Sequence, residues 1–273
     1  MAARGATRSH RGAQRVCSSL GARGLTRGLA RPAVLLLILV LLAAGPARRA
    51  LAEDDAVDLL LVLAADISRS VDDKKFRLQR EGYAAALTDP RVVRAMTGGP
   101  RGRIALSFVE WSSDGDQVVL VDWTAVGSEA AARSVAARVQ EAPRAFMGRT
   151  AIGAAIDFAV LQLGHSRFQA ARRVIDVSGD GTNNSGRPVT LARDAAIALN
   201  ITINGLVILS DVPLPTNPAH THPPGGLTAY YENNVIGGPD AFVVEAQSFA
   251  AFGQSLISKL VKEIADGHRG SPS

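Results

Sequence analysis

Residues 57–70 read Val-Asp-Leu-Leu-Leu-Val-Leu-Ala-Ala-Asp-Ile-Ser-Arg-Ser, and this stretch decides the fold. Its first nine residues are apolar except for Asp58, and most of them are Val or Leu. An apolar run of this length with polar residues at its ends is typical of a strand that is buried on both faces, as in a parallel sheet covered by helices. The stretch therefore predicts a central strand of an α/β domain.

Asp66, Ser68 and Ser70 follow this strand at alternate positions. They are expected at the carboxyl edge of the sheet, where open α/β sheets bind their ligands. One carboxylate and two hydroxyls are suitable oxygen ligands for a hard cation such as Mg²⁺. A purely structural interpretation also fits, because Ser70 and Asp73 match a helix capping box and Asp66 and Ser68 are common turn residues. The stretch alone leaves both interpretations open.

Strand and helix patterns alternate along the rest of the chain, which predicts a doubly wound α/β sandwich in one domain with helices on both faces. Residues 103–111 and 117–123 are joined by a short polar turn, so we expect an antiparallel edge strand in a mostly parallel sheet. The other predicted strands are 173–178, 201–209 and 241–244, with a loop at 213–226. The predicted helices are 72–87, 90–96, 128–141, 151–164, 188–200 and 247–265, and residues 229–235 are helical or irregular.

The basic character of the chain comes from its beginning. The formal net charge is +5, but residues 1–52 contain nine Arg and no acidic residue. The remainder carries 21 basic and 25 acidic residues and is close to −4. The high pI therefore gives no reason to expect a nucleic-acid partner.

Residues 1–52 have the pattern of an export signal. A basic segment precedes an apolar stretch at 33–44, and the small residues Ala50 and Ala52 suit cleavage before Glu53. The apolar stretch is shorter than the ~20 residues of a membrane-spanning helix. We expect a signal peptide at 1–52, a domain at 53–267, a disordered tail at 268–273 and a periplasmic or secreted protein. The alternative is an uncleaved leader that anchors the chain to the inner membrane, which is the only membrane contact expected.

Two further loops are expected at the same edge of the sheet. Asp180 follows the strand at 173–178 within a Gly-bracketed turn, and Thr150 immediately precedes the helix at 151–164. Mg²⁺ prefers an octahedral array of oxygen ligands and usually keeps water molecules. With few anionic ligands, the ion would retain positive charge and an open position for a carboxylate from elsewhere. The combined set holds two carboxylates and three hydroxyls: Asp66, Ser68, Ser70, Thr150 and Asp180.

The motifs Asp66-Ile67-Ser68-Arg69-Ser70, Gly148-Arg149-Thr150 and Ser178-Gly179-Asp180-Gly181 resemble the metal-ion-dependent adhesion site of von Willebrand factor A domains. The resemblance covers about residues 57–265. More narrowly, the chain is similar to a bacterial family of secreted A-like proteins, domain of unknown function 1194, in the stretches 78–83, 109–111, 173–181 and 235–239. The resemblance to the adhesion site implies direct coordination of a divalent cation by Asp66, Ser68, Ser70 and Thr150, and by Asp180 directly or through water. Arg69, Thr182 and Ser185 depart from the residues that are common in the family.

Other candidate residues favour structural interpretations. His220 and His222 have no third His or Cys nearby, so we interpret them as part of a solvated loop that can contact a partner. Asp176, inside an apolar strand, is interpreted as a satisfied core or edge carboxylate. Asn183 and Asn184 are interpreted mainly as turn residues. The second interpretation is that they donate hydrogen bonds that support the metal ligands. Cys17 is the only cysteine, so the predicted domain has neither disulfides nor thiolate ligands.

These features predict an exported, non-enzymatic protein-binding module. In this hypothesis, Mg²⁺, or another divalent cation such as Mn²⁺ or Ca²⁺, bridges the site to an exposed Asp or Glu of a protein partner. The alternative is a metal-dependent hydrolase of phosphoesters, although the sequence has neither a Gly-x-Ser-x-Gly elbow nor a phosphate-binding loop. A turnover assay with Mg²⁺ separates the two, and a purely structural ion is a third possibility.

Overall fold

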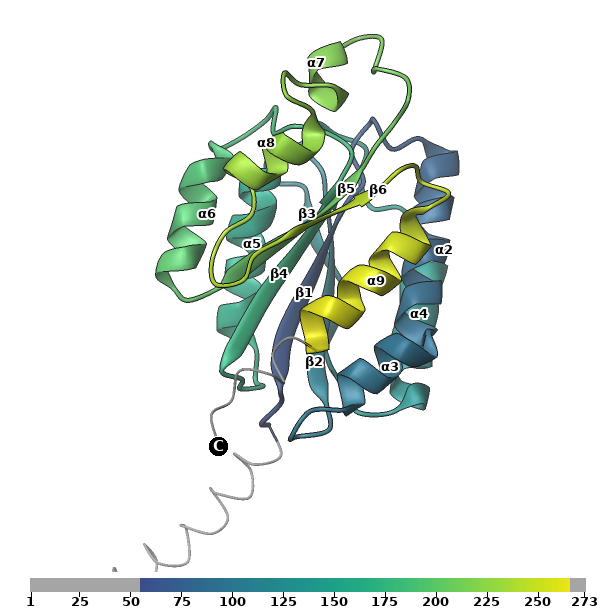
Figure 1. Cartoon of the computed structure of the whole chain (residues 1–273), viewed down its shortest axis with the longest axis vertical. Helices are drawn as coiled ribbons and strands as arrows, with labels where there is room; N and C mark the ends of the chain where they lie inside the picture. The colour runs from purple at the N-terminus through teal and green to yellow at the C-terminus, as the bar shows by residue number, and fades with distance from the viewer. Residues whose placement is uncertain (1–54, 266–273) are drawn as a thin grey trace, which may run out of the picture. The chain divides into compact units, whose positions relative to one another are not determined.

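The computed structural model describes residues 55–265, in which six strands form a single sheet in the order β3-β2-β1-β4-β5-β6 (Figure 1). In this part of the chain, β2 and β3 pair antiparallel at one edge and the other neighbouring strands pair parallel. The predicted leader at 1–52 and tail at 268–273 lie outside the described residues. The strands are β1 (Leu59–Asp66), β2 (Ile104–Trp111), β3 (Gln117–Val126), β4 (Arg172–Gly179), β5 (Thr202–Ile208) and β6 (Val243–Ala246).

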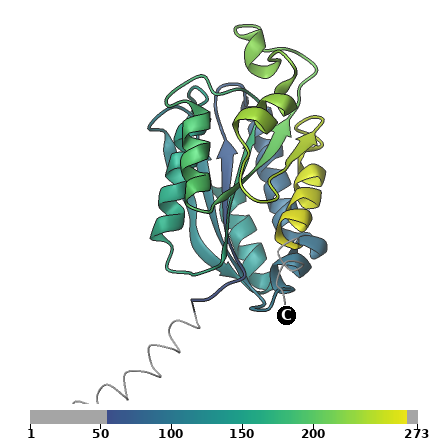
Figure 2. The ribbon, with the colours of Figure 1, turned by 60° about the vertical axis from the view of Figure 1, so that its left-hand side comes forward.

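Helices cover both faces of the sheet, as the alternating patterns predict (Figures 1 and 2). One face carries α2 (Asp73–Thr88), α3 (Pro90–Thr97), α4 (Glu129–Glu141) and α9 (Phe252–Ala265). The other carries α5 (Ile152–His165), α6 (Val189–Ala198) and α8 (Leu227–Asn234). The short helix α7 (Pro218–Thr221) lies beyond the carboxyl ends of the strands. Within residues 55–265, no helix is both long enough and apolar enough to cross a membrane.

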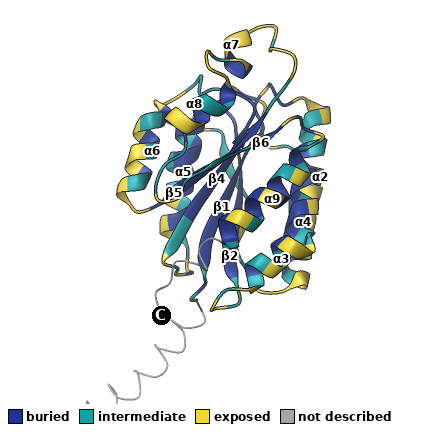
Figure 3. Cartoon of the chain, in the orientation of Figure 1, coloured by how far each residue is buried: buried dark blue, intermediate teal, exposed yellow. Residues whose placement is uncertain are grey.

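The position of β1 at the centre of the sheet explains why its sequence is apolar without interruption. All eight residues of β1 are buried (Figure 3). Leu59, Leu61 and Leu63 pack into the core below α2 and α9, whereas Leu60 and Val62 pack into the core below α5. A strand with helices on both faces has no solvent face, so the alternation of polar residues disappears.

The capping-box interpretation of Ser70 is wrong. The N-cap of α2 is Asp72, whose carboxylate accepts a hydrogen bond from the Lys75 backbone N at 2.8 Å. Asp72 therefore satisfies the helix end and leaves Ser70 free for other contacts. Ser128 caps α4 as predicted, through a hydrogen bond from the Ala131 backbone N.

Several predicted boundaries shift. β3 continues to Val126 because the antiparallel register gives Val126 a partner in Ile104 at the start of β2. β6 begins at Val243 instead of residue 241, and α9 begins at Phe252 instead of 247. The intervening segment is a turn in which the Ala251 backbone N donates to Ser248 Oγ at 3.3 Å. The loop predicted at 213–226 contains α7.

Candidate metal site

The five predicted side chains lie together at the carboxyl edge of the sheet, between β1 and β4. This is where the strand order reverses, the position at which doubly wound sheets bind ligands. Thr150 Oγ1 donates to Ser68 Oγ at 3.1 Å, and Ser68 Oγ lies 3.1 Å from Ser70 Oγ. Ser70 Oγ donates to Asp180 Oδ1 at 2.5 Å. All five side chains are buried, and the most exposed, Ser70, is 6% exposed.

The loop after β1 is held by its own backbone and by one arginine. The Ser68 backbone N donates to Asp66 Oδ1 at 2.7 Å, which folds the loop around the carboxylate. Arg144 Nη2 donates to the carbonyl oxygens of Ile67, Ser68 and Val71, at 2.6, 2.9 and 2.7 Å respectively. No local sequence pattern indicates this role of Arg144, because its side chain binds backbone carbonyls more than 70 residues away.

Two asparagines tie the loop after β4 to the loop before α5. Asn184 Oδ1 accepts from the Thr150 backbone N at 3.0 Å, and the Asn184 backbone N donates to the Thr150 carbonyl at 2.8 Å. Asn183 Oδ1 accepts from the Gly153 backbone N in the first turn of α5 at 3.1 Å. Both residues lie in the loop after β4, and their side-chain oxygens accept these hydrogen bonds, whereas the sequence-based interpretation has them as donors. They fix the position of Thr150 relative to Asp180.

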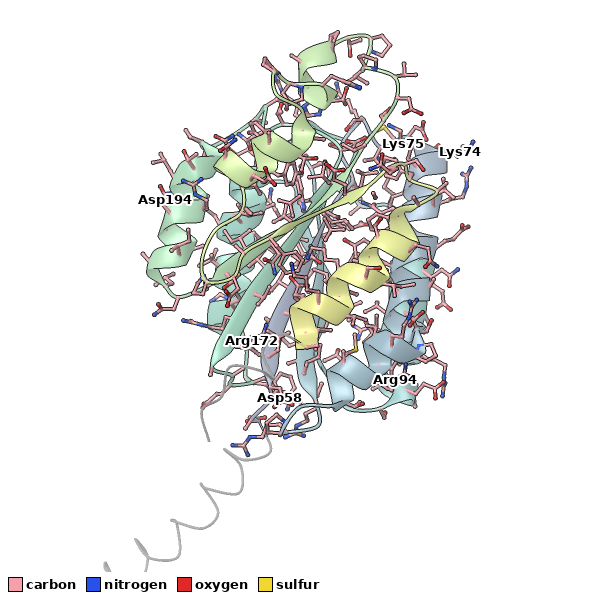
Figure 4. All side chains as sticks on the ribbon, in the orientation of Figure 1. Asp58, Lys74, Lys75, Arg94, Arg172 and Asp194 are labelled. Carbon is pink, nitrogen blue, oxygen red and sulfur yellow. The ribbon has the colours of Figure 1, made fainter. Side chains whose placement is uncertain are left out.

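The electrostatics of the site leave negative charge without full compensation. Asp66 Oδ2 is buried and has no hydrogen-bond partner among residues 55–265. Burial, together with the nearby charge of Asp180, raises the pKa of Asp66 to about 8. Lys75 compensates in part, since its Nζ lies 3.3 Å from Asp180 Oδ2 and donates to the Ser70 carbonyl at 2.7 Å. Figure 4 shows Lys75 near the start of α2, beside the carboxyl ends of the strands.

A divalent cation fits this set of donors. Hard cations prefer carboxylate and hydroxyl oxygens such as these, and Asp66 Oδ2 has no other partner among the described residues. In the described part of the chain, no three residues of the types His, Cys, Asp and Glu cluster as metal ligands. The donors at this site are therefore mainly hydroxyls, with two carboxylates.

Gly179, the last residue of β4, lets two polar groups approach the backbone. A Cβ at this position would lie 2.5 Å from Tyr231 Oη and 3.1 Å from Asp66 Oδ2. A larger residue would therefore displace the Tyr231 hydroxyl or the Asp66 carboxylate. Tyr231 Oη is also buried without a hydrogen-bond partner among the described residues, and sequence reasoning missed it.

The interpretation of His220 as a solvated residue is wrong. It is 3% exposed, and its Nε2 lies 3.2 Å from Thr150 Oγ1. Burial lowers the pKa of His220, against the opposing effect of the Asp180 charge. The Pro- and Gly-rich composition of the loop suggested exposure, but α7 turns His220 inward. His222 in the same loop is exposed, as predicted.

Asp176 is a buried core carboxylate, as predicted, but it is only partly satisfied: its Oδ1 has no hydrogen-bond partner among the described residues, and its ion-pair partner comes from α9. Lys259 Nζ lies 2.8 Å from Asp176 Oδ2 and 3.1 Å from Glu263 Oε1. Asn204 on β5 donates to the same Glu263 oxygen at 2.6 Å. This cluster joins α9 to the sheet and shares no residue with the candidate metal site.

The sheet order and the antiparallel edge strand are those of a von Willebrand factor A-like fold, and the Asp66-x-Ser68-x-Ser70 loop lies beside Thr150 and Asp180 at the carboxyl edge of the sheet. The chain belongs to the family described as "Protein of unknown function (DUF1194)", which matches residues 56–268. The predicted fold class and the resemblance to this family are both confirmed. A comparison with curated proteins found no match.

Solved structures share the fold at low sequence identity. Proximal thread matrix protein 1 from the mussel byssus is 16% identical, with a TM-score of 0.54 over 77% of this chain and 47% of that chain. The pilus adhesin SpaC from Lactobacillus rhamnosus GG, in an open conformation, is 14% identical, with a TM-score of 0.55 over 78% of this chain and 30% of that chain. A structure of the mussel protein with a zinc-occupied MIDAS motif is 14% identical, with a TM-score of 0.53 over 77% and 48%. This chain thus spans about half or less of each of these proteins.

Proposed function

We propose that this domain is an exported, non-enzymatic protein-binding module that depends on a metal ion. A divalent cation, Mg²⁺ or alternatively Mn²⁺ or Ca²⁺, occupies the carboxyl edge of the sheet and binds a carboxylate of an Asp or Glu on a protein partner. When bound, the ion supplies the positive charge that attracts this carboxylate. The ligands to the ion are Asp66, Ser68, Ser70, Thr150 and Asp180.

The observation that carries this proposal is the unpaired oxygen of Asp66. A buried ionised carboxylate is costly unless it is paired or coordinates a metal. Asp66 Oδ2 has no hydrogen-bond partner among the described residues, and Asp66 begins the loop whose Ser68 hydroxyl hydrogen-bonds to those of Ser70 and Thr150. A cation there would offset the cost of burying Asp66.

Two properties of the site favour binding over a purely structural ion. The two carboxylates balance the formal charge of a divalent cation, but the five proposed protein ligands leave one of six octahedral positions for a further oxygen ligand, which a partner carboxylate can fill. The exposed Arg69 lies between Ser68 and Ser70 in the loop and adds positive charge at the rim. The similarity in fold to a pilus adhesin, a byssus matrix protein and a zinc-occupied MIDAS structure is compatible with this function.

We further propose that residues 1–52 are a signal peptide and that residues 53–267 form the mature domain ahead of a disordered tail at 268–273. The protein then acts in the periplasm or outside the cell. N-terminal sequencing of the exported protein should give Glu53 as the first residue. Recovery of protein that retains residues 33–44 would instead support an anchor in the inner membrane.

The function is tested by capturing partners from envelope extract on immobilised protein. We expect a partner that binds in Mg²⁺, is released by a chelator, and is not retained by Asp66→Ala because the bridging ion is lost. Asp122→Ala, which removes an exposed carboxylate on β3, is the matched control and should retain the partner. A partner that stays bound in chelator, while circular dichroism shows a folded domain, would defeat the metal bridge.

A further inference from the structure

His220 lies beside the candidate metal site, on the segment between β5 and α8 that carries α7 above the carboxyl edge of the sheet (Figure 1). The Thr182 backbone N donates to the His220 carbonyl at 2.9 Å, and the His220 backbone N donates to the Asn217 carbonyl at 3.0 Å. Gly181 makes room for the ring, because a Cβ at this position would collide with the imidazole. The fold therefore fixes the place of a buried ring, whose nitrogens need hydrogen-bond partners among their neighbours.

The neighbours of His220 Nδ1 decide which ring nitrogen carries the proton. Nδ1 lies 3.3 Å from the side-chain amide nitrogen of Asn184. The orientation of this amide is fixed, since Asn184 Oδ1 accepts a hydrogen bond from the Thr150 backbone N at 3.0 Å. The amide nitrogen can only donate, so Nδ1 is the acceptor of a neutral ring and Nε2 carries the proton. Thr182 Oγ1, which lies 3.3 Å from Nδ1, can donate to it as well.

The proton on His220 Nε2 begins a chain of hydrogen bonds that runs in one direction. Nε2 donates to Thr150 Oγ1 at 3.2 Å, and the Thr150 hydroxyl donates to Ser68 Oγ at 3.1 Å. At the other end, the Ser70 hydroxyl donates to Asp180 Oδ1 at 2.5 Å. The single proton of Ser70 is used in that bond, so in the 3.1 Å contact between Ser68 Oγ and Ser70 Oγ it is Ser68 that donates.

The two ends of this chain require the same direction. A reversed chain would turn a lone pair of Ser70 toward the carboxylate of Asp180. It would also place the proton of His220 on Nδ1, against the amide of Asn184. In the observed direction, each of the three hydroxyls accepts one hydrogen bond and donates one, which leaves it with one further lone pair for a cation.

We propose that His220 is a positioning residue of the metal site. Its Nε2–H donates to the Thr150 hydroxyl and so keeps the proton of Thr150 directed toward Ser68, while the ligands to the ion remain oxygen atoms only. Metal ligands commonly depend on such outer hydrogen-bond partners, and loss of one typically lowers metal affinity about 10–100-fold. This inference rests on the proposed function, since it assumes that the five oxygen donors hold a cation.

Nuclear magnetic resonance of the wild type tests the position of the proton, and it needs no cation. In protein labelled with ¹⁵N in histidine, the His220 ring should be neutral at neutral pH, with its proton on Nε2. The proton should stay on Nε2 when Mg²⁺ is added, because the ring is not a ligand. The His220 signals are identified by their absence from the spectrum of His220→Gln. A proton on Nδ1, or on both nitrogens, would overturn the proposal.

Substitutions at His220 test its effect on the ion. By titration calorimetry, His220→Leu, which removes the donor, should bind Mg²⁺ at least about tenfold more weakly than the wild type. His220→Gln has an amide that can donate to Thr150, so it should recover most of this loss, which a role in packing alone would not explain. His222→Leu, the same change at an exposed histidine two residues away, is the matched control and should bind Mg²⁺ like the wild type.

These measurements separate the positioning role from the proposed function. If the wild type binds Mg²⁺ and His220→Leu binds it equally tightly, only the positioning role is wrong. The same holds if His220→Gln, shown to be folded by circular dichroism, binds Mg²⁺ no better than His220→Leu. If the wild type binds no divalent cation although the proton lies on Nε2, the proposed function fails and the positioning role with it. Because the proton is located in the wild type, the proposal can be overturned even if neither variant folds.

Discussion

Asp66→Ala should abolish the thermal stabilisation that a divalent cation gives the wild-type domain. A ligand that binds only the folded state at about 100 times its Kd stabilises it by about 2.7 kcal/mol. For a domain of this size, that corresponds to an increase of about 5–11 °C in Tm. Asp66 contributes one of only two carboxylates in the site, so we expect no increase in the variant. Thermal unfolding with Mg²⁺ and, separately, with Mn²⁺ measures this effect.

The metal-free Tm of Asp66→Ala distinguishes loss of the ion from damage to the fold. Burial and Asp180 raise the pKa of Asp66 to about 8, so the ionised carboxylate is unfavourable in the folded protein without a cation. The metal-free variant should therefore melt at or above the wild-type temperature. Asp122→Ala should respond to the cation like the wild type. If the cation raises the Tm of Asp66→Ala as much as that of the wild type, the cation does not bind at the loop after β1.

Lys259→Met should be the most destabilising substitution considered for this domain. Lys259 is fully buried and lies between Asp176 and Glu263, and the two carboxylates raise its pKa. Removing one partner from a buried ion pair typically costs about 3–5 kcal/mol because the other charge remains buried. The Tm measured by calorimetry should therefore fall by about 6–20 °C.

The loss of stability in Lys259→Met should depend on pH. Burial raises the pKa of Asp176 to about 7, well above its ordinary value of 3.8. A carboxyl group with a raised folded-state pKa contributes stability below about pH 4, and that contribution is lost as the pH rises through about 7. Without the Lys259 ammonium, Lys259→Met should lose more stability at pH 8 than at pH 5.

Lys262→Met is the matched control for Lys259→Met. Lys262 lies on the same helix but is exposed, with its Nζ 3.9 Å from the centroid of the Phe242 ring. Its loss should cost less than about 1 kcal/mol. If Lys259→Met melts within about 2 °C of the wild type, the buried cluster does not hold α9 against the sheet as inferred.

The sequence was sufficient for the fold because the signals that decide it are local. The run at 57–65 predicts a strand buried on both faces, and Asp66 and Asp180 follow their strands directly. Parallel strands end at one edge of a sheet, so the topology alone brings these loops together. The hairpin between β2 and β3 was predictable for the same reason, since its short turn is contiguous in the sequence.

The roles of Arg144, Lys259 and His220 could not be predicted, because they depend on contacts between distant segments. Arg144 binds carbonyl oxygens of the loop after β1, and Lys259 pairs with Asp176 from the far end of the chain. His220 lies in a segment whose Pro- and Gly-rich composition is typical of a solvated loop. Its burial results from the fold of α7 over Gly181 and Thr150, which no local pattern encodes.

The most direct test of the central claim, a divalent cation at the carboxyl edge of the sheet, is a crystal structure grown with Mn²⁺. The anomalous difference map should show one strong peak at about 2.0–2.3 Å from Ser68 Oγ, Ser70 Oγ and Thr150 Oγ1, as expected for metal–oxygen bonds. Asp66 should lie beside the peak, and Asp66→Ala crystals should lack it. A map with no peak among these oxygens, at a Mn²⁺ concentration that saturates the protein in solution, would contradict the account.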